Sequence, residues 1–72
     1  MSDYSALRQS VERFCEKPDG LFEFISVISC INSLPKGALT GAELSDIEKL
    51  LESCPHDHAL SIRFKLLEYQ ID

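Results

Sequence analysis

The chain has 72 residues, 44% of them hydrophobic and 26% charged, which is the composition of a globular domain rather than of a disordered or membrane-spanning segment. A chain of this length forms one domain at most, with a small core. Twelve acidic and seven basic residues give a net charge of −5. Because that charge repels phosphate and anionic lipid, we expect no direct binding to nucleic acid and none to a membrane.

The sequence also predicts the cellular location of the protein and the oxidation state of its thiols. No basic segment followed by an apolar run stands near Met1, so we expect no signal peptide and a cytoplasmic protein. The longest apolar stretch, residues 21–34, is too short to cross a bilayer and contains several polar residues. Cys15, Cys30 and Cys54 are odd in number and lack C-x-x-C spacing, which predicts reduced thiols on apolar helix faces.

The first two predicted helices differ in how much of their surface is apolar. Residues 3–17 place one apolar stripe on a helix whose other face is charged, and the stripe consists of Tyr4, Leu7, Val11 and Phe14. The turn after Lys17 contains proline and glycine, which end the helix. Residues 21–34 are apolar around most of the helix circumference. This pattern predicts a central helix with neighbours on several sides.

The third predicted helix, residues 41–54, has the clearest start. Thr40 and Glu43 have the spacing of a capping box, and Pro55 ends the helix. Its apolar stripe consists of Leu44, Ile47, Leu50, Leu51 and Cys54. A DNA-binding helix-turn-helix is disfavoured, because the first turns of this helix carry acidic residues and no arginine.

The fourth predicted helix, residues 58–71, carries two apolar stripes, one made of Leu60, Phe64, Leu67 and Ile71 and the other of Ala59, Ile62, Leu66 and Tyr69. His56 or Asp57 would cap its start. With the three preceding segments it predicts an all-α fold for residues 1–72, a compact single domain of about four short helices arranged as two antiparallel helical hairpins.

Metal-ligating residue types gather only around Pro55, where Cys54, His56 and His58 lie within five positions. A zinc site normally needs ligands from a second segment, and no second cluster exists, so we favour an interhelical turn with exposed histidines. Nothing in the sequence combines a nucleophile, a base and an oxyanion hole. We therefore expect no metal, no cofactor, no catalytic residue and no enzymatic activity.

The surplus of apolar surface suggests the function. One small interior cannot bury two strongly apolar helices on all sides, and exposed apolar patches commonly mark partner surfaces. We expect the first stripe of residues 58–71 to be core and the second to bind a partner, with Arg63 beside it. The predicted partner-binding residues are Ile62, Arg63, Leu66, Tyr69 and Gln70.

The predicted function is a small acidic helical protein–protein interaction module, acting as an adaptor, a chaperone-like protein or an inhibitor. Its partner is another protein, and a homodimer is one form that such binding takes. The alternative is an accessory transcriptional regulator that acts through a DNA-binding partner protein. The net charge argues against direct DNA binding, but it does not discriminate between these two functions, because neither requires the protein to bind DNA.

Overall fold

The computed structural model describes residues 3–70 and confirms an all-α single domain. The helices of this range are α1 (Asp3–Glu16), α2 (Leu21–Asn32), α3 (Gly41–Glu52) and α4 (Asp57–Gln70), and no strand occurs within it. The predicted end of the last helix, at Ile71, lies outside the described residues. The helices α2 and α3 end two residues earlier than predicted, because Pro35 and Pro55 disfavour helical geometry in the residue before each of them.

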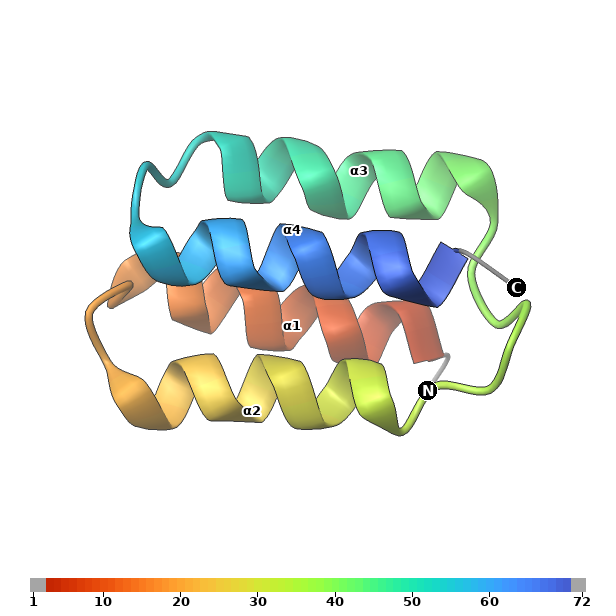
Figure 1. Ribbon diagram of the computed structural model, residues 1–72, viewed down its shortest axis with the longest axis horizontal. Helices are drawn as coiled ribbons and strands as arrows, with labels where there is room; N and C mark the ends of the chain where they lie inside the picture. Colours follow the sequence, from red (N-terminus) through yellow and green to blue (C-terminus); the bar gives the residue numbers. More distant parts are fainter. Residues whose placement is uncertain (1–2, 71–72) are drawn as a thin grey trace.

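The four helices form a bundle in which each helix packs against two others (Figure 1). The hairpins α1–α2 and α3–α4 are antiparallel, as Figure 1 shows. The helix α2 also packs against α4, and α1 against α3. The helices α2 and α3 therefore occupy opposite corners, and the segment 33–40 joins them across one end of the bundle. Each helix has one side facing the interior and one facing away.

All four helices contribute to the core. Leu7, Val11 and Phe14 of α1 are fully buried, as their spacing predicts. The predicted stripe of the third helix is buried as well, except for Leu50, which is only partly buried. The remaining core residues come from α2, α4 and the connecting segments. The buried set is Leu7, Val11, Phe14, Val27, Ile31, Leu39, Leu44, Ile47, Leu51, Cys54, Ala59, Ile62 and Leu66.

Local hydrogen bonds define where α3 and α4 begin. The capping box is present: the Glu43 amide donates to the Thr40 hydroxyl at 3.1 Å, and the Thr40 amide donates to the Glu43 carboxylate at 2.9 Å. At the start of α4 it is His56 whose side chain caps, because its ring Nδ1 accepts from the His58 amide at 3.1 Å. Such caps each contribute about 1 kcal/mol to helix stability.

A polar cluster that the sequence pattern did not reveal ties α1 to α3. The Tyr4 hydroxyl and the Arg8 guanidinium both donate to the carboxylate of Asp46. These bonds, first that of Tyr4 and then that of Arg8, hold the pKa of Asp46 below its ordinary 3.8. The cluster lies at the surface and fixes how the two helices pair.

Candidate interaction surface

The structure reverses the predicted roles of the two stripes on α4. Ile62 and Leu66 are fully buried, and Ala59 is nearly so. In the stripe that was predicted to be core, the exposed fractions are 50% for Leu60, 64% for Phe64 and 48% for Leu67. The prediction of which stripe fills the interior was therefore wrong for these residues, and Ile71 lies outside the described part of the chain.

Contacts at both ends of α4 explain this orientation. At the start, the His58 ring stacks on Phe24 with centroids 4.4 Å apart, and its Nδ1 lies 3.0 Å from the Pro18 carbonyl oxygen. At the other end, the Tyr69 hydroxyl donates to the Pro35 carbonyl at 2.7 Å and accepts from the Ala38 amide at 3.0 Å. A helix held at both ends in this way turns Phe64 outward. Stripe spacing alone cannot reveal these contacts, because each joins segments far apart in sequence.

The five predicted partner-binding residues make contacts within the bundle. Ile62 and Leu66 lie in the core, so neither is available to a partner, and the Tyr69 ring packs against that core. The Arg63 guanidinium lies 3.7 Å from the Glu52 carboxylate of α3. The Gln70 amide reaches Glu48, also on α3, at 3.4 Å. Arg63 alone combines partial exposure with a place beside the outward stripe, where it lines a shallow hollow of about 160 Å³ with Leu60, Phe64 and Leu67.

The helix α2 is also more exposed than its composition predicts. Only Val27 and Ile31 of α2 are buried, whereas the exposed fractions are 62% for Leu21, 80% for Phe22 and 52% for Ile25. The prediction of a central helix was wrong because α2 occupies a corner of the bundle, with only α1 and α4 against it. Its outward side has no helix to cover it.

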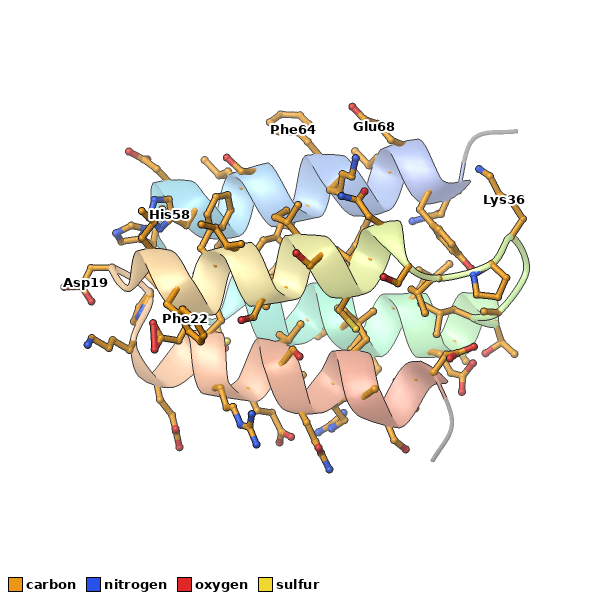
Figure 2. All side chains as sticks on the ribbon, turned by 90° about the horizontal axis from the view of Figure 1, so that it is seen from below. Asp19, Phe22, Lys36, His58, Phe64 and Glu68 are labelled. Atoms are coloured by element: carbon orange, nitrogen blue, oxygen red, sulfur yellow. The ribbon has the colours of Figure 1, made fainter. Side chains whose placement is uncertain are left out.

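The exposed large hydrophobic residues form two sets. Leu60, Phe64 and Leu67 of α4, which we define as the apolar face, line one hollow. Leu21, Phe22 and Ile25 lie on α2, where Phe22 lines a hollow with residues of α1. Among residues 3–70, these six are the large hydrophobic side chains that the structure leaves exposed. Figure 2 shows Phe64 projecting away from the bundle on α4 and Phe22 on the side of α2 nearer α1. With about 200 Å² for a large side chain, the face exposes roughly 300 Å², which lies within the range of the largest apolar patches on monomeric proteins.

Charge is distributed unevenly around the bundle. The helices α1 and α3 together carry seven acidic and three basic residues, a net charge of −4. The helices α2 and α4 carry three acidic and two basic residues, a net charge of −1. Exposed polar positions of α2 are mostly small and uncharged, among them Ser26 and Ser29. The apolar face therefore lies on the weakly charged half of the molecule.

The cluster around Pro55 does not converge on a common point. Cys54 is buried, the His56 ring caps α4, and the His58 ring stacks on Phe24, so each side chain has its own role. Within residues 3–70, no three His, Cys, Asp or Glu side chains are grouped closely enough to hold a metal ion. An open hollow of about 350 Å³ borders this turn, and Arg63 and Leu60 lie on its far side.

The three thiols are unpaired in the described range and are partly or fully buried. Burial raises the pKa of the Cys15 thiol, and the nearby Cys54 thiol adds to this shift. Burial likewise raises the pKa of Cys30. The Cys15 thiol donates to the Leu50 carbonyl at 3.6 Å, which joins α1 to α3. Because the thiolate is the reactive form, these two cysteines are poor nucleophiles.

None of the helices in the described range combines the length and the apolar character needed to cross a membrane. Comparisons with protein-family models, with curated proteins and with solved structures found no match for this chain.

Proposed function

We propose that the protein is a small interaction module that binds another protein through its apolar face. The observation that carries this proposal is the grouping of three exposed large hydrophobic side chains, Leu60, Phe64 and Leu67, around one hollow on α4. Isolated exposed hydrophobic residues are ordinary, but a grouped patch of this size favours a protein-binding role.

The composition of the face supports binding of a protein rather than of a small molecule. Its side chains line an open hollow of only about 160 Å³ beside Phe64 instead of surrounding an enclosed cavity. Aromatic residues and arginine are enriched in protein interfaces, and the face contains Phe64 with Arg63 at its border. An adaptor, a chaperone-like protein and an inhibitor would all use such a surface.

Site-specific photo-cross-linking in the native host tests the proposal. A benzophenone amino acid replaces Phe64 in one variant and Gln9, an exposed residue of α1, in the matched control. We expect protein adducts from position 64 and few from position 9. Adding Leu67→Glu to the position-64 variant should reduce the adduct yield at least about tenfold, because a carboxylate would be desolvated in the interface. Equal adducts from both positions would contradict the proposal.

A further inference from the structure

The helix α4 begins at a histidine whose backbone and ring both act as a cap. The carbonyl oxygen of His56 accepts the first bonds of the helix, from the Ala59 amide at 3.0 Å and the Leu60 amide at 3.3 Å. Its ring Nδ1 accepts from the His58 amide at 3.1 Å. The usual side-chain acceptor at this position is an oxygen of Ser, Thr, Asp or Asn, and none of these gains a proton near neutral pH. A histidine cap differs from them because it responds to mild acid.

The bond of the cap fixes where the His56 ring carries its proton. An amide can only donate, so Nδ1 of His56 must offer a lone pair, and the ring proton lies on Nε2. The His58 ring has the opposite arrangement, because the Pro18 carbonyl oxygen can only accept. Nδ1 of His58 therefore carries a proton and donates to Pro18 at 3.0 Å. Of these two rings, His56 is the one that acts as an acceptor.

A second proton has different effects on the two rings. On His58 it enters at Nε2 and leaves the bond to Pro18 in place. On His56 it enters at Nδ1, which then points an N–H at the amide N–H of His58, and the cap bond is lost. Turning the His56 ring over does not restore the bond, since both nitrogens of an imidazolium are donors. The positive end of the helix dipole also repels the new charge.

The charged groups beside His56 largely offset one another. Glu52 of α3 and Arg63 of α4 line the same hollow as His56, and their side chains lie 3.7 Å apart, so their charges act on His56 in opposite directions. Asp57 favours a positive ring, but it is exposed and screened by water. The other titratable group that lines the hollow is the buried Cys54 thiol. The cap bond therefore decides how the fold responds to protonation of His56.

The groups on the α1–α2 side lie around His58. The turn that accepts the His58 bond carries Lys17 and Asp19, which have opposite charges, and Figure 2 shows Asp19 at the same end of the bundle as His58. Glu23 of α2 lines the hollow between α1 and α2. The His58 ring itself lies beside the His56 ring, with centroids 4.8 Å apart. Two positive rings at that distance repel, which adds to the loss of the cap.

We infer that α4 begins at a proton-sensitive cap, which holds the first turn of the helix at about pH 8 and releases it at about pH 5. The stabilisation is present while His56 is neutral and is lost as pH falls through the range in which histidine gains a proton. The first turn contains Leu60, so acid loosens one end of the apolar face. The cap acts in the isolated chain and needs no partner.

Urea unfolding of the full chain with two replacements of His56 tests the inference. His56→Asn keeps a side-chain acceptor that does not titrate, whereas His56→Ala has no acceptor at any pH. At about pH 8 the unfolding equilibrium constants of wild type and His56→Asn should agree within about twofold. At about pH 5 the constant of wild type should be about fivefold larger than that of His56→Asn and should match that of His56→Ala. Because His58 and every carboxylate are common to these chains, the comparison isolates His56.

NMR of isotope-labelled wild type is the second measurement, and it requires no variant to fold. At about pH 8 the ring couplings should place the proton of His56 on Nε2 and that of His58 on Nδ1. The His58 amide, after correction for the intrinsic pH dependence of exchange, should lose protection at least about threefold at about pH 5. A ratio of wild type to His56→Asn that is the same at both pH values overturns the inference. A His56 ring with its proton on Nδ1 at about pH 8 overturns it equally.

Discussion

At the scale of single residues, neighbouring positions of α4 have opposite roles. Leu66 is fully buried, whereas Leu67 is about half exposed. The two side chains differ by one position, or about 100° of helix rotation. Both residues are leucine, so a difference between the effects of the same substitution at the two positions reports the environment of the side chain alone.

Alanine substitution at these two positions should therefore give unequal losses of stability. Leu66→Ala leaves a cavity in the core and should lower the free energy of unfolding by about 2–5 kcal/mol. Leu67→Ala should lower it by less than about 1 kcal/mol. Urea denaturation followed by circular dichroism measures both. Equal losses would show that the stripe of Leu67 is as buried as that of Leu66.

The lowered pKa of Asp46 predicts how the stability of the fold changes as pH falls. Its pKa is lowered in the folded state by Tyr4 and then by Arg8, so its contribution is complete above the ordinary value of 3.8 and is lost as pH falls through the folded-state pKa. In Asp46→Asn, the melting temperature should fall less steeply between neutral pH and pH 3 than it does in wild type. Glu12→Gln, at a carboxylate 3.9 Å from Arg8, is the control. The effect would be refuted if the melting temperatures of wild type and Asp46→Asn fell equally steeply with pH.

The partly buried thiols of Cys15 and Cys30 are predicted to react slowly. Burial raises the pKa of Cys15 and of Cys30, which reduces the thiolate fraction at pH 8. Alkylation by iodoacetamide, read out by peptide mass spectrometry, should be about tenfold slower or more at these residues in the folded chain than in urea. Similar rates at Cys15 in both conditions would mean that its thiol is not protected by the fold.

At the scale of helices, the sequence was sufficient where a helix has one apolar stripe and insufficient where it has two. The stripes of α1 and α3 predicted their buried faces, and the Thr40 capping box predicted where α3 begins. On α2 and α4 the apolar pattern covers opposite sides, so hydrophobicity cannot select the inner one. The selection comes from contacts of His58 and Tyr69 with distant segments, which no local spacing contains.

The end contact of α4 can be tested by Tyr69→Phe. This substitution removes the hydroxyl that joins Pro35 and Ala38, and leaves the Ala38 amide without that acceptor. We expect the free energy of unfolding to fall by about 1–2 kcal/mol. Thermal and urea melts provide the measurement, and Tyr4→Phe shows whether loss of any tyrosine hydroxyl has the same cost. A Tyr69→Phe protein as stable as wild type would remove this contact from the explanation of helix orientation.

At the scale of the whole molecule, charge and apolar surface occupy different halves. The acidic helices α1 and α3 are joined by the Tyr4–Arg8–Asp46 cluster, while α4 presents the apolar face and α2 the second set of exposed hydrophobic residues. A small bundle cannot enclose every apolar side chain of four helices, since each helix keeps an outward side. The part of the surplus that groups around one hollow on α4 is usable as a binding surface.

The most direct test of this division is the helicity of Ile62→Glu and Phe64→Glu, measured by circular dichroism. We predict that Ile62→Glu is largely unfolded, because it buries a carboxylate in the core, and that Phe64→Glu keeps the helicity of wild type. A folded Ile62→Glu protein together with an unfolded Phe64→Glu protein would contradict the assignment of interior and surface on α4.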